Sequence, residues 1–340
     1  MLNLISDVSG LLVGNAHDEN LLSGVTALIF EEPATASIAI HGGAPGVRDG
    51  ALLEPDMTVE KIDALVLSGG SAFGLDAPGG VQGFMREQGR GFTVGEARIP
   101  IVPGAILFDL INGGDKNWGR KPPYWELGYA AAAAAAKGFS IGSIGAGFGA
   151  TTANLRGGLG SASARTSAGF VVGALVAVNA IGSATIGDGP HFWAAPYERD
   201  GEFGGLGLPA GFTAADLALQ LKGAPAPPKL ENTTIAVVAT DAALSKAQAK
   251  RLAVIAHDGM ARALRPSHAA MDGDLIFAAA TGRAAREASL PDQIEIGALA
   301  ADCLARAIAR AIYSADAATG AGSKPGWRQR FINQNVRHTS

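Results

Sequence analysis

The sequence predicts an α/β fold, because the chain contains both apolar β-branched runs and alanine-rich segments of helical character. The runs have the length of buried strands and lie at 25–30, 36–40, 64–67, 170–178 and 231–240. The alanine-rich segments lie at 127–137, 252–264 and 296–310. With 340 residues, 48% of them hydrophobic, the chain can bury a large core in one large or two ordinary domains.

Composition argues against several classes of partner. Charged residues make up only 17% of the chain, the net charge is −4, and no basic cluster lies in its body, so we expect no nucleic-acid partner. We expect no signal peptide, and we find no apolar run suited to a membrane span. The single cysteine, Cys303, excludes an intramolecular disulfide and fits a reducing compartment. It falls in a helical pattern, where core packing is the expected role. We therefore expect a cytoplasmic protein.

The first half of the chain contains turns that leave apolar strands. The runs 25–30 and 36–40 are separated by Glu-Glu-Pro-Ala, which predicts a hairpin, and a glycine-rich loop follows at 41–46. The strand at 64–67 leads through a Gly-Gly-Ser turn into a helix around 81–87. This turn is not a nucleophile elbow, because the pattern G-x-S-x-G requires glycine where this chain has Phe73. Ser71 is interpreted as a turn residue or a pocket hydroxyl.

A second motif raises a different class of function. Gly145-Ala-Gly-Phe-Gly-Ala150 formally satisfies the dinucleotide-binding pattern G-x-G-x-x-A. The residues after it do not predict a helix, and no acidic residue lies near the required 20 positions further on. A dinucleotide-binding oxidoreductase is therefore only a remote alternative.

The run at 231–240 is the most informative stretch. Asn232-Thr233-Thr234 follows a proline-rich approach, and such a sequence is commonly a turn into a buried strand. A second interpretation is that the chain cuts its own bond between Asn232 and Thr233. Thr233 would then carry a hydroxyl and a free α-amine on one residue, which makes an activated nucleophile with its own base. The ordinary pKa of an α-amine, about 7.7–8.0, suits proton transfer near neutrality.

Two carboxylates follow downstream. Asp272 and Asp274 are separated by one glycine as the chain enters another apolar run. On a strand they would face the same side, and the pKa of one of two adjacent carboxyl groups should rise, so that the pair could share a proton. An exposed Asp-Gly-Asp turn is the alternative.

Together, five blocks of the sequence resemble the DmpA family of self-processing peptidases, which includes D-aminopeptidase/esterases, β-peptidyl aminopeptidases and the nylon-oligomer hydrolase NylC. The resemblance runs from about residue 5 to about residue 285. It implies a four-layer α/β/β/α sandwich that resembles the N-terminal-nucleophile hydrolases with different connectivity. It also implies an alpha chain of residues 1–232 and a beta chain of residues 233–340 in one structural domain. The blocks lie at 41–48, 62–76, 157–162, 231–238 and 272–274.

The resemblance assigns roles to individual residues. Thr233, Asp272 and Asp274 correspond to the nucleophile and its acidic partners, and Asn179, at the end of the strand at 170–178, corresponds to an oxyanion donor. On local pattern alone Asn179 would be a turn residue. The resemblance suggests Tyr124, with Tyr129 as an alternative, as a residue that holds the substrate or the oxyanion. Asn154 lies beside the pocket, where some relatives have lysine, and this change should favour substrates with a cationic amino group.

These observations predict an amidohydrolase without a cofactor. His257 and His268 could in principle act as bases, but the family pattern uses neither, and no spacing of histidines, cysteines or carboxylates indicates a metal. The expected substrate is a short peptide with a free N-terminal amine, and the alternative is an oligoamide cut by an endo-acting hydrolase. By resemblance we expect a homo-oligomer, a tetramer of alpha-beta units. The basic segment 320–340 is expected to be a flexible tail or to dock on a neighbouring subunit.

Overall fold

The computed structural model describes residues 1–223, 232–316 and 324–332. The predicted cleavage loop at 224–231 and most of the predicted tail lie outside the described residues. The strands are β1 (Leu11–Asp18), β2 (Ser23–Ile40), β3 (Val47–Arg48), β4 (Lys61–Ser68), β5 (Phe92–Val94), β6 (Ala97–Ile99), β7 (Gly104–Ile106), β8 (Gly158–Arg165), β9 (Val171–Asn179), β10 (Thr233–Thr240) and β11 (Leu275–Ala280). The helices are α1 (Ala77–Glu87), α2 (Tyr124–Ala133), α3 (Lys246–Ala263), α4 (Leu290–Ser314) and α5 (Trp327–Phe331).

Short 3₁₀ helices connect these elements. They are η1 (Ile5–Asp7), η2 (Ala51–Leu53), η3 (Ser71–Asp76), η4 (Gly145–Gly147) and η5 (Ala195–Tyr197). Of these, η4 covers the motif that formally matches a dinucleotide-binding loop. It is one turn of 3₁₀ helix and does not open an α-helix, so the phosphate-binding geometry of that motif is not formed.

One long strand, β2, joins two halves of the main sheet. The strand order is β3-β7-β4-β2-β11-β10-β9-β8, and β1 pairs with the first part of β2. The first part of β2 lies between β1 and β4, whereas its last six residues pair with β11. The second half of the sheet, β11-β10-β9, is mixed, because β10 runs parallel to β11 and antiparallel to β9.

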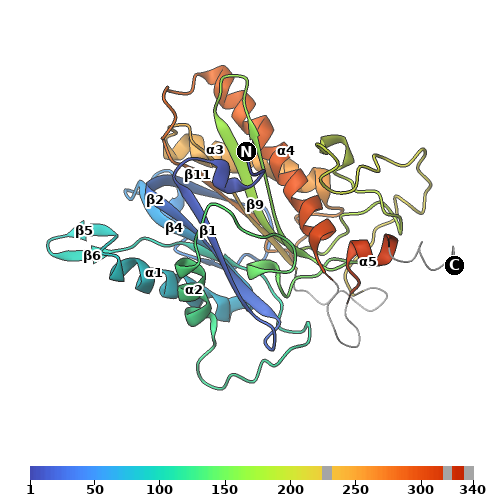
Figure 1. Cartoon of the computed structure of the whole chain (residues 1–340), viewed down its shortest axis with the longest axis horizontal. Helices are drawn as coiled ribbons and strands as arrows, with labels where there is room; N and C mark the ends of the chain where they lie inside the picture. Colours follow the sequence, from blue (N-terminus) through green and yellow to red (C-terminus); the bar gives the residue numbers. More distant parts are fainter. Residues whose placement is uncertain (224–231, 317–323, 333–340) are drawn as a thin grey trace.

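The side chains of the sheet alternate between three separate cores, and this alternation produces four layers. On β10, Ile235 and Val237 point into the core between the two sheet halves, together with Leu28 and Leu65. Val238 points instead into the core beneath α3 and α4. A third core lies between α1, α2 and the other half of the sheet. The layers are therefore helices, sheet, sheet and helices, which confirms the predicted fold class (Figure 1).

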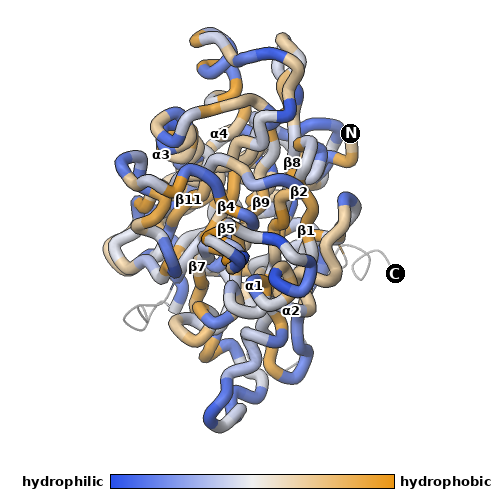
Figure 2. Tube along the Cα trace, turned by 90° about the vertical axis from the view of Figure 1, so that its left-hand side faces the viewer, coloured by the Kyte–Doolittle hydropathy of each residue, from blue (hydrophilic) through white to orange (hydrophobic). Residues whose placement is uncertain are grey.

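Hydropathy follows this layered arrangement. In Figure 2 the hydrophobic colour is concentrated on the central strands, and hydrophilic stretches mark many of the outer loops. Cys303 lies on α4 in the core beneath the sheet and is fully buried, as the helical pattern predicted. Among the residues that the structure describes, no helix combines the length and the apolar character needed to cross a membrane.

The predicted hairpin at 25–40 is wrong. The segment forms the single 18-residue strand β2, and its register against β4 shifts between Ile29 and Ala34. The shift contains Pro33, which lacks an N–H for the ladder, and the residues from Glu31 to Pro33 are exposed. The sequence therefore marks an irregularity in one strand, not a reversal of the chain.

The C-terminal segment docks on its own chain where it is described. Trp327 is 2% exposed, stacks on Phe192 at 5.6 Å between ring centroids, and donates its indole N–H to the Pro190 carbonyl. The Pro325 carbonyl accepts a hydrogen bond from the backbone N–H of Arg156. Residues 324–332 are therefore packed against the irregular segment after β9. The rest of the predicted tail lies outside the described residues, and docking on a neighbouring subunit stays a prediction.

Candidate active site

The fold brings most of the predicted residues to one end of the three central strands. Thr233 is the first residue of β10 and lies opposite Asn179, the last residue of β9. Asp274 directly precedes β11, and Asn232 forms a β-bridge with Asp272. Antiparallel pairing on one side and parallel pairing on the other thus place residues distant in sequence within one buried cluster.

The Thr233 hydroxyl lies against the carbonyl of the residue before it. Its Oγ1 donates a hydrogen bond to the Asn232 carbonyl oxygen at 2.6 Å, and the backbone N–H of Gly273 donates to the same oxygen at 2.9 Å. Two donors therefore polarise the peptide carbonyl between Asn232 and Thr233. A carbonyl held in this way already has a hydrogen-bond donor for the negative charge that develops on its oxygen during attack.

The residue between the two aspartates has to be glycine for steric reasons. A Cβ on Gly273 would lie 2.6 Å from Thr233 Oγ1, which is closer than carbon and oxygen can approach. The neighbouring loop is equally tight, because a Cβ on Gly42 would meet the Asp272 carbonyl oxygen at 2.3 Å. The glycines thus allow the backbone of the Asp-Gly-Asp segment to approach Thr233.

Asp274 links two segments of the chain through hydrogen bonds to its carboxylate. Its Oδ1 accepts the backbone N–H of Thr234 at 2.8 Å, and its Oδ2 accepts both the backbone N–H and Nδ1 of His268 at 2.9 Å. The carboxylate is 2% exposed. These bonds hold the start of β10 and the 268–274 loop together.

Asp272 differs from Asp274 in one respect. Its Oδ2 accepts the backbone N–H of Ala269 at 2.8 Å, whereas its Oδ1 is buried without a hydrogen-bond partner among the described residues. Burial, reinforced by the Asp274 carboxylate nearby, raises the pKa of Asp272 to about 7. The side chain can therefore gain or lose a proton near neutral pH, next to the Asn232–Thr233 peptide.

Asn179 is held by several bonds. Its amide nitrogen donates to the Phe108 carbonyl at 2.8 Å, and its Oδ1 accepts from the backbone N–H of Thr151 and from Nζ of Lys222. The donor on the Asn232 carbonyl is instead Gly273. In the uncleaved chain Asn179 thus lies beside Thr233 on the neighbouring strand without bonding to the carbonyl that would be attacked.

Lys222 was not found from the sequence. Its Nζ lies 2.8 Å from Asn179 Oδ1 and 3.1 Å from the Thr151 carbonyl oxygen. Burial of the amine, together with the nearby charge of Lys324, lowers the pKa of Lys222 to about 7. Lys222 therefore places a basic group beside Asn179, although Asn154 stands where some relatives have lysine. No local motif marks Lys222, which lies in a stretch without regular structure.

The two predicted substrate-binding residues bond to other parts of the chain. Tyr124 is fully buried and donates its hydroxyl to Ser23 Oγ, which in turn donates to Asp109 at 2.6 Å. This burial argues against contact with a substrate in the uncleaved chain. Asn154 donates to Thr185 Oγ1 at 3.0 Å and thereby ties two loops together. Tyr129, the alternative to Tyr124, bonds to Glu87 on helix α1.

Three histidines gather behind Asp274. His41 stacks on His257 with 3.6 Å between ring centroids, and His268 meets both rings at steep angles. Burial lowers the pKa of His257 to about 3, so this ring is neutral. No local pattern predicts this cluster, because the three residues come from a loop, a helix and a second loop and share no short spacing.

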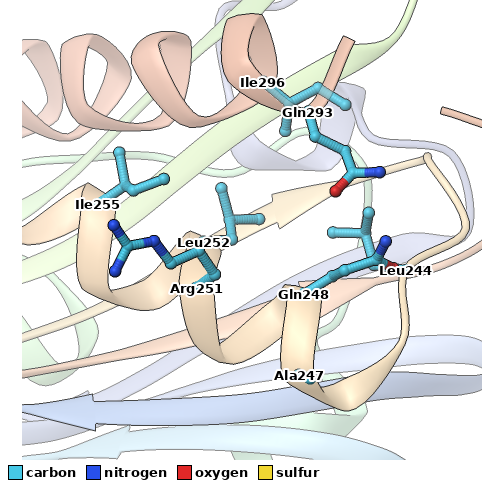
Figure 3. A pocket seen from close by; sticks show the side chains of 8 residues that line it. All are labelled: Leu244, Ala247, Gln248, Arg251, Leu252, Ile255, Gln293 and Ile296. Carbon is cyan, nitrogen blue, oxygen red and sulfur yellow. The ribbon is translucent and has the colours of Figure 1, made fainter. Parts of the chain in front are cut away.

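A surface pocket lies at the opposite end of the central strand. It is formed by the first turns of α3 and α4 and lined mainly by aliphatic side chains, among them Leu244 and Ile255, with Arg251 and Gln293 (Figure 3). Helix α3 follows the last residue of β10, whereas Thr233 is its first residue, and eight strand residues span about 25 Å. This pocket is therefore separate from the Thr233 site.

The fold is one that solved structures of aminopeptidases share. The first such structure is a beta-aminopeptidase from Burkholderia sp., with a TM-score of 0.73 and 19% sequence identity; the match covers 99% of this chain and 94% of the other. The second is an L-aminopeptidase D-Ala-esterase/amidase from Ochrobactrum anthropi. The second has a TM-score of 0.70 and 19% identity, with the same coverage, and is described as a variant of the Ntn hydrolase fold.

The chain belongs to peptidase family S58, whose family model matches residues 3–325. An uncharacterized aminopeptidase of Mycobacterium tuberculosis is 40% identical over 97% of this chain and 98% of its own length. A 6-aminohexanoate-oligomer endohydrolase of Kocuria sp. is 28% identical over 81% of this chain and 74% of its own length. The protein is therefore an enzyme of the aminopeptidase and amidohydrolase type, as the resemblance implied.

Proposed function

We propose that the chain cuts itself between Asn232 and Thr233 and then works as an N-terminal-threonine amidohydrolase. The contact that carries this proposal is the Thr233 hydroxyl at 2.6 Å from the oxygen of the Asn232 carbonyl, to which the Gly273 N–H also donates. The nucleophile, the peptide that it would attack and an oxyanion donor are thus already assembled in the uncut chain.

Self-cleavage would begin with attack by Oγ1 of Thr233 on the Asn232 carbonyl carbon. The hydroxyl proton passes to a base, for which Asp272 is suited because its Oδ1 is free among the described residues and its pKa is about 7. The C–N bond then breaks, the Thr233 amine receives a proton, and an ester joins the two segments. Water hydrolyses this ester, which leaves a carboxylate on Asn232 and a free hydroxyl and amine on Thr233.

The buried side chain of Asn232 favours this cleavage. It is 1% exposed, and neither atom of its amide has a hydrogen-bond partner among the described residues. An unpaired buried polar group costs about 1–3 kcal/mol. After cleavage Asn232 ends a free segment and can leave for solvent, which relieves this cost and opens space beside Thr233.

In the mature enzyme the same hydroxyl would attack a substrate amide. The α-amine of Thr233 accepts the hydroxyl proton, Asp272 assists, and the acyl group of the substrate forms an ester with Oγ1 before water releases it. The Gly273 N–H, now without the Asn232 carbonyl, is a donor for the substrate oxyanion, and Asn179 is a second candidate once the cleaved ends separate. Fragments 1–232 and 233–340 would stay together, because β10 lies between β9 and β11. The active unit would be a cytoplasmic homotetramer of alpha-beta pairs.

The proposed substrate is a short peptide with a free N-terminal amine. An unpaired carboxylate oxygen of Asp272 beside the nucleophile can accept a charge-assisted hydrogen bond from a substrate ammonium group. The 40% identity to an aminopeptidase supports this assignment. The second candidate is endo-acting hydrolysis of an oligoamide, which the 28% identity to a 6-aminohexanoate-oligomer endohydrolase favours.

Intact mass spectrometry of the purified protein, with a denaturing gel, tests the proposal. We expect two fragments, one ending at Asn232 and one beginning at Thr233, that co-elute under native conditions. A chain that stays whole after prolonged incubation at neutral pH and yet hydrolyses peptides would contradict self-cleavage. Recovery of an ester between a slow amide substrate and Thr233 would identify the nucleophile directly.

A further inference from the structure

The three histidines behind Asp274 are arranged as a metal site would be. His41 follows β2, His257 lies in α3, and His268 lies in the loop before β11. One ring nitrogen from each lies within 4.8 Å of those of the other two. Imidazole is a common ligand for zinc, and three histidines form a known zinc ligand set, in which a fourth position stays open.

Two of the rings present a nitrogen that lacks any other partner. Nδ1 of His257 and Nε2 of His268 are both buried and have no hydrogen-bond partner among the residues that the structure describes. His257 itself is only 2% exposed. Buried polar atoms are normally paired, and an orphan atom requires an explanation such as an ion. Two such orphans on adjacent rings point to one shared ligand.

The other nitrogen of each of these two rings is hydrogen-bonded to a group outside the histidine cluster, as in metal sites. Nε2 of His257 is 3.1 Å from the Ala39 carbonyl oxygen, and Nδ1 of His268 is 2.9 Å from Asp274 Oδ2. Histidines that bind metals usually donate their second N–H to a carbonyl or a carboxylate, which fixes the ring and makes the ligating nitrogen more basic. Both rings thus leave the orphan nitrogen as the one available to an ion.

His41 has to turn to complete the site. Its ring is nearly parallel to that of His257, at 14°, and two parallel stacked rings cannot both direct an in-plane lone pair at one ion. His41 is exposed, so its side chain can rotate without disturbing the core. Ligand atoms about 2.1 Å from a tetrahedral ion lie about 3.4 Å apart, so the rings would also have to draw together.

We propose that His41, His257 and His268 form a binding site for one divalent transition-metal ion of the zinc type. The ion would lie on the side of Asp274 away from Thr234 and would fix this carboxylate through His268. Because Asp274 also accepts the N–H of Thr234, next to the nucleophile, the site would stabilise the end of the sheet at which the active site lies. This site does not depend on self-cleavage or on the substrate of the enzyme.

Metal binding can be measured without any assay of activity. Tag-free protein, stripped with chelator, is dialysed against ZnCl₂ and its metal content determined, and CoCl₂ titration is followed by visible absorption. We expect one equivalent of metal per chain, a cobalt spectrum typical of nitrogen ligands, and a melting temperature that rises with zinc concentration.

Two variants separate the proposed site from adventitious binding. His41→Ala removes an exposed ligand. His268→Asn removes Nε2, and it keeps an amide donor for Asp274 and a residue type that tolerates the positive φ of 58° at this position. Both should lose at least about tenfold in metal affinity, whereas the control His191→Ala, which alters a distant histidine, should bind like the wild type. Less than half an equivalent in the wild type, or full affinity in either variant, overturns the proposal. If His268→Asn does not fold, His41→Ala alone decides.

Discussion

Nζ of Lys222 donates a hydrogen bond to Oδ1 of Asn179, 2.8 Å away. The bond determines which end of the Asn179 amide faces the lysine, and it leaves the NH₂ group on the side of the Phe108 carbonyl. Lys222 thus orients the side chain of the residue that lies opposite Thr233 on the neighbouring strand.

Lys222→Met should slow self-cleavage by at least about tenfold, because the amide of Asn179 loses the group that orients it. The appearance of the Thr233 fragment, followed by intact mass, measures this rate. The control is Lys121→Met, which removes an exposed lysine and should cleave like the wild type. Equal rates for both variants would show that Lys222 does not position the site for self-cleavage.

Thr233→Ala should abolish both self-cleavage and hydrolysis, because one hydroxyl is proposed to serve both steps. Thr233→Ser keeps the hydroxyl and should retain part of each activity, since it lacks only the methyl group that restricts rotation of the side chain. Mass spectrometry follows the first step and amide hydrolysis the second. Fragments that still form in the alanine variant would exclude Thr233 as the nucleophile.

Gly273→Ala should block self-cleavage without removing any polar group. The new Cβ would lie 2.6 Å from Thr233 Oγ1, so the hydroxyl or the backbone that donates to the Asn232 carbonyl has to move. We expect a loss of at least about 100-fold, as for a misplaced catalytic group. Gly211→Ala is the control, because a Cβ there meets nothing within 4 Å. Normal cleavage in Gly273→Ala would show that the close approach of residue 273 to Thr233 Oγ1 is not needed for cleavage.

The sequence predicted the layers better than the site. The apolar run that becomes β10, which is buried along its whole length, and the alanine-rich segment that becomes part of α3 are local signals that the structure reproduces. The bond between Lys222 and Asn179 and the contact of His41 with His257 have no local signal, because only the tertiary fold brings these residues together. Backbone donors such as the Gly273 N–H leave no trace in residue types at all.

Self-cleavage should depend on pH through Asp272. Its pKa is raised to about 7 by burial and by Asp274, while the Ala269 N–H, His268 and Lys222 act in the opposite direction. If the carboxylate takes the hydroxyl proton, the rate should rise about tenfold per pH unit below 7 and then level off. Asp272→Asn should slow cleavage by at least about 100-fold and remove this dependence. A pH profile that is unchanged in this variant would exclude Asp272 as the base.

The raised pKa of Asp272 also predicts that stability falls as the pH rises, whereas the cleavage rate rises. The folded state favours the protonated carboxyl group, so its contribution to stability is present below the ordinary pKa of 3.8 and is lost as the pH rises through about 7. Asp272→Asn stays neutral and can still accept the Ala269 N–H, so its melting temperature at pH 8 should exceed that of the wild type. The comparison is made in the Thr233→Ala background, where both chains remain uncut. A lower melting temperature for the asparagine variant would show that the buried carboxylate stabilises the fold.

The last prediction separates exo-acting from endo-acting hydrolysis. Asp272 Oδ1 is buried and unpaired among the described residues, and in the mature enzyme it can hold the ammonium group of a substrate at the position that Asn232 vacates. Small amino-acyl p-nitroanilides should therefore be cleaved, and N-acetylation, which removes the positive charge, should lower kcat/KM at least about tenfold, because a charge-assisted bond contributes about 1.5–3 kcal/mol. Each N-acetylated compound is compared with the free-amine compound that is otherwise identical to it. Equal or faster hydrolysis of the acetylated series, together with cleavage inside 6-aminohexanoate oligomers, would favour an endo-acting amidase.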